Sequence, residues 1–265
     1  MARIEQGDCL EKLVRVPTGS VDLAVLDPPY NLGMDYHAYE DNQPQAEYLS
    51  WVRRWLDEVR RCLRPSGSAW FFINPKLSSE VDTVAKDLGL RLRNKICWSY
   101  TFGQAAVKGF TTSHTEILYY VKSDDFYFDG SKIKVPSARQ AKYKDKRAKP
   151  GGKLPDDTWV LFPEQLPEAY DPSGDVWLHS RVCGTYKERE TVSPNQLPIP
   201  LVERIVLCST KPGDVILDCF LGSGTSAVVA ARHGREIIGF DLSEKCIQRS
   251  KERYREEIER AARAG

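Results

Sequence analysis

The sequence lacks the features that mark secreted, zinc-binding or membrane-spanning chains. Its seven cysteines form no Cys-x-x-Cys pair, and none lies at zinc-ligand spacing with the four histidines. It shows no signal peptide and no apolar run of the length that a membrane span needs. An odd number of cysteines without a pattern is typical of a reducing compartment. We therefore expect a cytoplasmic protein with no bound metal and no membrane contact.

The sequence also lacks an overall basic excess, because 38 Lys and Arg against 37 Asp and Glu leave a formal net charge of +1. A nucleic-acid site must then come from local clustering. One cluster spans residues 131–153, where nine basic residues stand against a single acid, Asp145. The nine are Lys132, Lys134, Arg139, Lys142, Lys144, Lys146, Arg147, Lys149 and Lys153. A solvated loop is one interpretation of such a run, and phosphate contacts explain its density better.

The composition allows one large domain or a domain with an inserted module. The chain has 265 residues, of which 41% are apolar, enough for a sizeable core. Residues 123–190 hold many prolines and glycines and show little periodicity, which favours an insertion. We therefore predict a domain formed by residues 1–122 and 191–265, interrupted by a recognition region at 123–190.

Apolar periodicity predicts the elements of this domain. We expect strands at residues 3–6, 21–26, 68–74, 91–100, 114–122, 214–218 and 236–241. We expect helices at 47–63, 76–88 and 199–209, one that begins at 226, and a charged last helix capped by Ser243. The segment Arg64-Pro65-Ser66-Gly67 is expected to end the first long helix. Strands that alternate with helices predict an α/β fold.

The strongest motif follows the strand predicted at residues 21–26. Five of these six residues are apolar, which suits a strand covered on both faces. Asp27-Pro28-Pro29-Tyr30 comes next, and its prolines forbid further strand pairing and fix the backbone direction. A carboxylate, a stiff turn and an aromatic ring thus stand at the carboxyl end of a strand. Open α/β sheets place their ligand chemistry there.

Asp27-Pro28-Pro29-Tyr30, followed by Asn31, resembles the catalytic motif of amino-group DNA methyltransferases, which act on N6 of adenine or N4 of cytosine. An exocyclic amine is a poor nucleophile until two acceptors draw its lone pair out of the ring. The Asp27 carboxylate and the Pro28 carbonyl are the expected acceptors. Tyr30 offers a ring on which an extruded base can stack. The chain has no Pro-Cys dipeptide, so the thiol nucleophile of cytosine-C5 methyltransferases is not expected.

A second motif has the form Asp218-x-Phe220-x-Gly222-x-Gly224. This motif belongs to a nucleotide-binding βαβ unit, which consists of a strand, a glycine-rich loop, a helix, a second strand and a final acid, Asp241. The acid would form hydrogen bonds with ribose hydroxyls. The glycines also satisfy the dinucleotide pattern with alanine in third place, so NAD binding stays open on this loop alone. The aspartate four residues before the first glycine resembles the S-adenosylmethionine loop of methyltransferases.

The catalytic motif precedes the cofactor loop, and the basic region lies between them. That order resembles the permuted β class of amino DNA methyltransferases over nearly the whole chain. The resemblance implies a Rossmann-like, seven-stranded, mostly parallel sheet. Strand 214–218 would be its centre, with strand 21–26 on one side and strand 236–241 on the other, so that both motifs meet at one edge.

The resemblance also implies S-adenosylmethionine as the cofactor. The residues expected to bind it are Asp8, Asp27, Asn195, Gln196, Asp218, Phe220, Gly222, Ser223, Gly224, Thr225, Asp241 and Leu242. Asp8 has helix capping as an alternative role. Asn195 and Gln196 are the candidates for the cofactor carboxylate, because Ser193–Pro198 departs from the His-Pro-Thr-Gln-Lys-Pro common in the family. The residues expected to bind DNA are Lys142, Lys144, Lys146, Arg147 and His114, of which the last could equally be structural.

These features predict a site-specific methyltransferase for adenine N6 in double-stranded DNA. An aspartate at the first motif position more often accompanies adenine in this family, and cytosine N4 is the alternative. A methyltransferase for free small molecules or protein glutamine, a catalytically silent DNA-binding relative and an NAD enzyme are more distant alternatives. The family is compatible with a homodimer, a cognate restriction enzyme as partner, and a bacterial, archaeal or phage origin.

Overall fold

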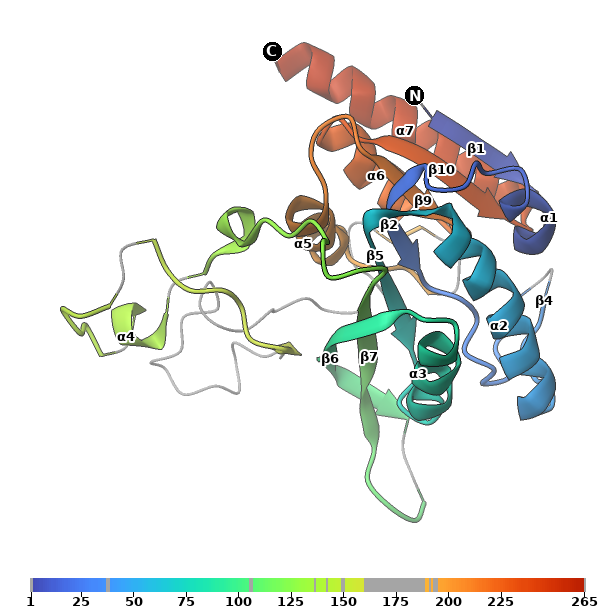
Figure 1. Ribbon diagram of the computed structural model, residues 1–265, viewed down its shortest axis with the longest axis horizontal. Coiled ribbons are helices and arrows are strands. Elements are labelled where there is room, and N and C mark those ends of the chain that lie inside the picture. The colour runs from blue at the N-terminus through green and yellow to red at the C-terminus, as the bar shows by residue number, and fades with distance from the viewer. Residues whose placement is uncertain are drawn as a thin grey trace.

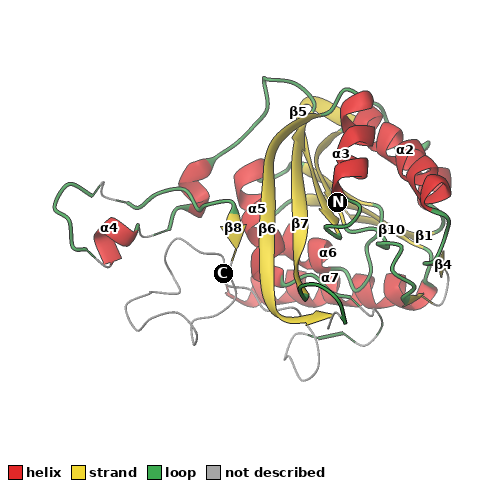
Figure 2. Ribbon diagram, turned by 90° about the horizontal axis from the view of Figure 1, so that it is seen from below, coloured by secondary structure: helices red, strands yellow, loops and turns green. Residues whose placement is uncertain are grey.

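A sheet with helices on both faces dominates the computed structural model (Figures 1 and 2). The structure describes residues 2–36, 39–104, 107–135, 137–141, 143–148, 151–159, 189–190, 192 and 195–264. The predicted site residue Lys142, the motif residues Ser193 and Pro194, and residues 160–188 of the predicted insert lie outside this range. Within it, no helix is long and apolar enough to cross a membrane.

The sheet has the strand order β1-β10-β9-β2-β5-β7-β6-β8. Its strands are β1 (Ala2–Gln6), β2 (Val21–Leu26), β5 (Leu63–Ile73), β6 (Arg91–Gln104), β7 (Thr112–Val121), β8 (Thr158–Trp159), β9 (Val215–Asp218) and β10 (Glu236–Asp241). Neighbouring strands are parallel except where β7 pairs with β5 and β6. The predicted seven-stranded, mostly parallel sheet is confirmed, and β8 adds a two-residue strand at its edge. As expected, β9 lies between β2 and β10.

Helices cover both faces of the sheet, and each face packs with its helices in one apolar cluster. They are α1 (Cys9–Leu13), α2 (Gln45–Cys62), α3 (Ser78–Asp87), α5 (Ile199–Ser209), α6 (Thr225–Arg232) and α7 (Glu244–Ala264), with the short η1 (Gly130–Ile133) and α4 (Ala138–Ala141) in the predicted insert. One cluster gathers residues of α1, α2 and α3, and the other gathers residues of α5, α6 and α7. A two-stranded hairpin, β3 (Asp35–Tyr36) and β4 (Tyr39–Glu40), follows the Asp27–Tyr30 turn.

β2 is buried along its whole length, as its apolar run predicts. Leu23 and Val25 point into the cluster of α5 and α6, whereas Ala24 and Leu26 point into the cluster of α2. Alternate side chains therefore serve opposite faces, which is how a central parallel strand uses a continuous apolar sequence. Because β2 runs parallel to β5 and β9, the carboxyl ends of the three strands lie at the same edge of the sheet.

Asp22 is the polar exception in β2, and its contacts explain why it is tolerated. Its carboxylate accepts one hydrogen bond from Arg64 Nη1 at 2.8 Å and another from the Val215 backbone N–H at 2.9 Å. These bonds join β2 to both of its neighbours in the sheet, β5 and β9. A buried carboxylate with such donors is satisfied rather than unpaired.

The expectation that Arg64–Gly67 ends the first long helix is wrong. α2 ends at Cys62, and β5 begins at Leu63 and runs through this segment. Val21 pairs with Leu63 at the start of the strand. A Cβ on Gly67 would lie 3.1 Å from the carbonyl oxygens of Val21 and Asp22. The glycine therefore permits a close approach of two strands, and strand pairing takes the place of a turn.

We expect Asp22→Ala to destabilise the fold, because the Val215 N–H and the Arg64 guanidinium lose their buried acceptor. The free energy of unfolding should fall by about 1–3 kcal/mol, as for other unsatisfied buried groups. Asp57→Ala is the matched control, since Asp57 pairs with Arg60 on the exposed face of α2, and its loss should stay below about 1 kcal/mol. Urea unfolding followed by circular dichroism measures both. Equal losses would contradict the bridging role of Asp22.

Candidate active site

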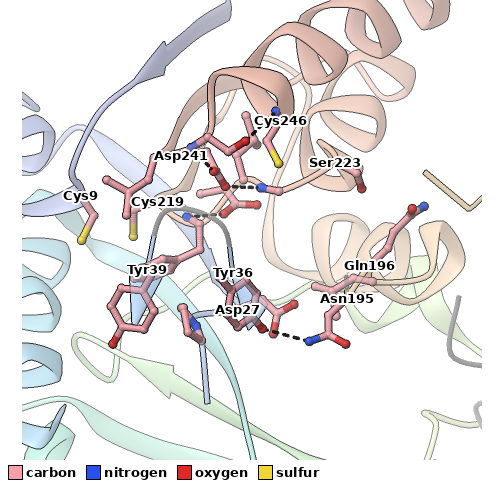
Figure 3. Close-up of a pocket in the computed structure, with 18 of the residues that line it drawn as sticks. Cys9, Asp27, Tyr36, Tyr39, Asn195, Gln196, Cys219, Ser223, Asp241 and Cys246 are labelled. Atoms are coloured by element: carbon pink, nitrogen blue, oxygen red, sulfur yellow. Dashed lines mark hydrogen bonds between the residues drawn. The ribbon is translucent and has the colours of Figure 1, made fainter. Parts of the chain in front are cut away.

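A pocket with a cavity volume of about 290 Å³ opens at the carboxyl ends of β2, β9 and β10. It brings together most residues that the sequence assigned to the site (Figure 3). These are Asp8, Asp27, Pro29, Tyr30, Asn195, Gln196, Asp218, Phe220, Gly222, Ser223, Thr225, Asp241 and Leu242. Of the other site residues that the structure describes, Pro28, Gly224, His114, Lys144, Lys146 and Arg147 lie outside the pocket lining.

The turn that leaves β2 is fixed by two tyrosine hydroxyls. Tyr30 donates to Asp27 Oδ1 at 2.5 Å, and buried Tyr48 of α2 donates to the Pro29 carbonyl at 2.9 Å. Burial, and then the negative charge of Asp27, raise the pKa of Tyr30 well above its ordinary value. The phenol therefore keeps its proton and stays a donor. The carboxylate of Asp27 is thus held in one orientation at the pocket wall.

Asp41 organises the loop that follows this turn, and it is only 3% exposed. Its carboxylate accepts hydrogen bonds from the backbone N–H groups of Asn31, Leu32 and Met34 at 2.7, 3.1 and 3.0 Å. Asn31 has φ 57°, and its side chain exchanges bonds of 2.8 and 2.7 Å with the backbone of Gln43. The loop is therefore closed at its base, which fixes the direction of the β3–β4 hairpin that it carries.

The hairpin meets the segment before α5 across the pocket. Asn195 Nδ2 donates to the hydroxyl oxygen of Tyr36 at 3.0 Å (Figure 3). The next residue, Gln196, is 7% exposed, and its Oε1 accepts from the Glu190 backbone N–H at 2.8 Å. Asn195 and Gln196 thus reach the pocket as expected, and both side chains also hold neighbouring segments in place.

The glycine-rich loop begins where β9 ends. The Asp218 carboxylate accepts a hydrogen bond from the Phe220 backbone N–H at 3.0 Å and another from the Ser226 hydroxyl. Gly224 precedes α6 in the left-handed conformation, with φ 84°, and a Cβ there would lie 2.6 Å from Ser250 Oγ. Both the backbone conformation and the close approach of α7 therefore require glycine.

Backbone groups hold the other acid of the βαβ unit. The Asp241 carboxylate accepts from the N–H groups of Gly222 and Ser243, each at 2.8 Å. Arg253 of α7 donates to the Ser223 carbonyl at 2.7 Å and holds the loop from its far side. The loop and the acid after β10 thus form one connected unit (Figure 3). Each Asp241 oxygen already accepts one bond and retains a second acceptor position.

Asp8 combines the two roles that the sequence left open. Its carboxylate caps α1 by accepting from the Leu10 N–H at 2.8 Å, and the residue also lines the pocket. Capping one helix end uses one oxygen, so it does not exclude a ligand contact by the other.

Sequence reasoning missed three residues that shape the site, Tyr48, Trp51 and Asp41. The Trp51 ring lies edge-on to Phe220, with centroids 5.7 Å apart, and lines the pocket. Tyr48 and Trp51 are three residues apart on α2, a spacing that places them on one helix face and could have drawn attention to them. Asp41 gives no local signal, because its donors lie 7 to 10 residues earlier in the chain.

The pocket is strongly acidic. Asp8, Asp27, Asp35, Asp218 and Asp241 line it, and the described lining contains no Lys, Arg or His. Burial raises the pKa of Asp218 to about 7, and burial also raises the pKa of Asp241. Such a site attracts a ligand with positive charge and opposes a pyrophosphate. Across the described ranges, no three His, Cys, Asp or Glu side chains converge as metal ligands.

The predicted basic cluster lies apart from the pocket and is described in part. Lys144 and Lys146 are exposed, and the Arg147 side chain is 85% exposed while it pairs with Asp145 at 3.0 Å. Figure 1 shows the neighbouring α4 far out from the sheet. His114 lies in β7, half-buried and paired with Ser99 of β6.

Fold and site together define an α/β protein with a pocket beside a fixed carboxylate at the carboxyl ends of its central strands. A family model described as DNA methylase, covering N6 and N4 methyltransferases, matches residues 21–252. The chain belongs to this family of amino DNA methylases.

Individual relatives agree with this assignment. Type II methyltransferase M.HpaI of Haemophilus parainfluenzae is 33% identical, over 97% of this chain and 75% of the relative. DNA adenine methyltransferase YhdJ of Escherichia coli K12 is 30% identical, over 92% of this chain and 80% of the relative. A Thermus thermophilus protein described as a DNA modification methylase, solved with S-adenosyl-L-methionine, shares the fold with a TM-score of 0.63. It is 23% identical over 97% of this chain and 95% of that one.

The raised pKa of Asp218 predicts a pH-dependent stability. Folded Asp218 keeps its proton up to about pH 7, whereas an unfolded aspartate loses it near pH 4, so the folded state binds more protons between these values. The contribution of Asp218 to the free energy of unfolding should therefore fall as the pH rises from about 4 to about 7. The total fall should be up to about 4 kcal/mol, and the contribution should stay low above about pH 7.

Asp218→Asn should remove this dependence, because the amide does not ionise. Urea unfolding at pH 5, 6, 7 and 8 should show the stability of the variant gaining on that of the wild type across the series. Asp57→Asn, on the exposed face of α2, is the control and should track the wild type. If the free energies of unfolding of the wild type and of Asp218→Asn changed with pH in parallel, Asp218 would ionise with its ordinary pKa.

Proposed function

We propose that this protein transfers a methyl group from S-adenosylmethionine to the amino group of a base in DNA, with adenine N6 as the target. The observation that carries the proposal is the Asp27–Tyr30 turn, which opens into the same pocket as the glycine-rich loop. Membership of the amino DNA methylase family supports the reaction class. The turn follows β2 and the glycine-rich loop follows β9, so the amine and the cofactor would occupy separate parts of the pocket.

The charge of the pocket supports S-adenosylmethionine over a dinucleotide. This cofactor carries a cationic sulfonium and an ammonium group, which the ionised aspartates of the lining favour. An NAD pyrophosphate would meet the same carboxylates without a basic partner among the described lining residues. The S-adenosylmethionine complex of the Thermus protein with the same fold points the same way. When bound, the cofactor supplies an activated methyl group, so the protein needs no nucleophile of its own.

The pocket residues divide among the parts of such a cofactor. Asp241 is suited to ribose hydroxyls and Asp8 to the adenine amino group. Asn195 and Gln196 are suited to the carboxylate, and the Asp218 acid lies at the base of the loop. Ser223, Thr225, Phe220 and Leu242 complete the wall around these polar groups. Gly222 lies in the lining, and Gly224, outside it, allows the loop to pass close to α7.

The catalytic turn would prepare the target amine. Asp27 is placed to accept one N–H of the amine, and the Pro28 carbonyl is the proposed acceptor of the other. Because Tyr48 already donates to the carbonyl of Pro29, that neighbouring oxygen has a fixed partner of its own. Tyr30 is the proposed ring beneath the extruded base, and its hydroxyl holds Asp27 in orientation.

We also propose that residues 123–190 recognise double-stranded DNA. The exposed Lys144, Lys146 and Arg147 are suited to phosphate contacts, and Lys142 belongs to the same run of sequence. His114 is not in the pocket lining, so we assign it no contact with the extruded base. The Type II name of the bacterial relative M.HpaI favours a cytoplasmic modification enzyme, with a cognate restriction enzyme and a second copy as candidate partners.

Asp27→Ala should separate catalysis from cofactor binding. Methyl transfer to DNA should fall by about two orders of magnitude or more, the scale of losing one preorganised contact. Binding of S-adenosylmethionine, measured by calorimetry, should change much less. Asp57→Ala on the exposed face of α2 is the control, with unchanged transfer. Near wild-type turnover in Asp27→Ala would contradict the assignment of Asp27 as amine acceptor.

We propose adenine as the target base because an aspartate at the first position of the turn more often accompanies adenine in this family. The name of the adenine methyltransferase YhdJ supports adenine, whereas the family covers both N6 and N4 chemistry. DNA methylated with methyl-labelled cofactor, digested to nucleosides and separated, should carry label in N6-methyladenine. Label in N4-methylcytosine would overturn the adenine assignment and leave the catalytic roles intact.

A further inference from the structure

The turn between β6 and β7 exposes two apolar side chains completely. Val107 is 101% exposed and Phe110 is 99% exposed, while the next most exposed large apolar side chain described, Tyr143, is 67% exposed. Lys108 and Gly109 between them are exposed as well. Apolar side chains held in water cost free energy, so a pair of them at one hairpin tip marks a contact surface.

The strand directions place this tip at the catalytic edge of the sheet. β5 runs parallel to β2, and β7 returns antiparallel to β5, with Ile73 at the end of β5 opposite Glu116. β6 and β7 continue past that pair, with Ser99 opposite His114 and Gln104 opposite Thr112. The hairpin therefore projects beyond the edge at which the catalytic turn leaves β2. Figure 1 shows the described part of the turn below the strands of the sheet.

The base of the hairpin shares an apolar cluster with the catalytic turn. Tyr100 and Tyr30 both pack against the same apolar cluster. The Tyr100 hydroxyl lies 3.3 Å from that of Thr115 on the paired strand, and its ring meets Trp98 edge-on with centroids 5.7 Å apart. The tip is thus the outer end of a braced hairpin whose base packs against the same apolar cluster as the proposed base-binding ring.

The charge around the tip fits an anionic polymer. Lys108 lies between the two apolar side chains, and Lys76, also exposed, follows the carboxyl end of β5 at the same edge. A cation within an apolar wedge matches a DNA duplex, in which phosphates enclose a stack of apolar base faces.

We propose that Phe110, assisted by Val107, inserts into the DNA duplex beside the target base and fills the space that the extruded base leaves. This inference rests on the proposed function, because only an enzyme that modifies a base within duplex DNA must take that base out of the stack. Lys108 contacts a flanking phosphate. The wedge lowers the cost of extrusion and has no part in methyl transfer itself.

The test compares two DNA substrates that carry the protein's own methylation site, found by sequencing DNA from cells that express it. One duplex is fully paired, and in the other the target base is mispaired and so easier to extrude. Phe110→Ala should lower kcat/KM on the paired duplex by about tenfold or more and on the mispaired duplex by less than about threefold. Phe110→Leu, which keeps an apolar wedge, should restore most of the loss.

Val14→Ala is the matched control, because Val14 is an apolar side chain 64% exposed at the end of α1, and neither substrate should be affected. An equal loss of kcat/KM on both duplexes in Phe110→Ala, or no loss, would overturn the proposal. So would a loss that coincides with a change from dimer to monomer in light scattering, since the tip would then join two copies of the chain. A wild type that methylates neither duplex would instead refute the proposed function.

Discussion

The pairing of β2 with β9 is the constraint on which the site depends. Leu23 lies opposite Ile216 and Ala24 opposite Leu217, so segments about 193 residues apart in the chain run side by side. Because the two strands are parallel, both end at one edge, and the catalytic turn and the glycine-rich loop leave the sheet as neighbours. Asp22 secures this pairing by accepting the Val215 N–H. Without the pairing of β2 with β9, the carboxylate that would polarise an amine and the loop that would hold a cofactor would not share a pocket.

Backbone N–H groups compensate for the concentration of acids at that edge. Asp8, Asp218 and Asp241 each accept at least one backbone N–H, and Asp41 accepts three. These bonds orient the carboxylates before any ligand arrives, which is the form of electrostatic preorganisation that catalysis and binding use. The compensation is incomplete in the deepest position, since burial still raises the pKa of Asp218 to about 7. A cationic ligand would supply the missing counter-charge and favour the ionised form.

The sequence predicted the sheet and most of the pocket because those features follow from local patterns. The apolar run before Asp27 and the spacing of Asp218 to its glycines each specify a strand end, and the family resemblance supplied the strand order. Local patterns failed where tertiary contacts decide. Gly67 looked like a helix stop, yet it serves a close approach of two strands. Tyr48 and Asp41 act on backbone groups 7 to 19 residues away, and no spacing rule connects such partners.

The near-neutral net charge conceals a separation of charge that suits the proposed reaction. The described pocket lining has five acids and no base, whereas basic residues gather in residues 131–153, outside that lining. A DNA phosphate would be repelled from the pocket, but a purine is uncharged and can enter it. The DNA backbone must then remain outside the pocket while one base enters it and reaches the carboxylate of Asp27. The proposed reaction therefore requires extrusion of the base, and the apolar end of the β6–β7 hairpin, with Lys108 on it, lies at the edge where that extrusion would occur.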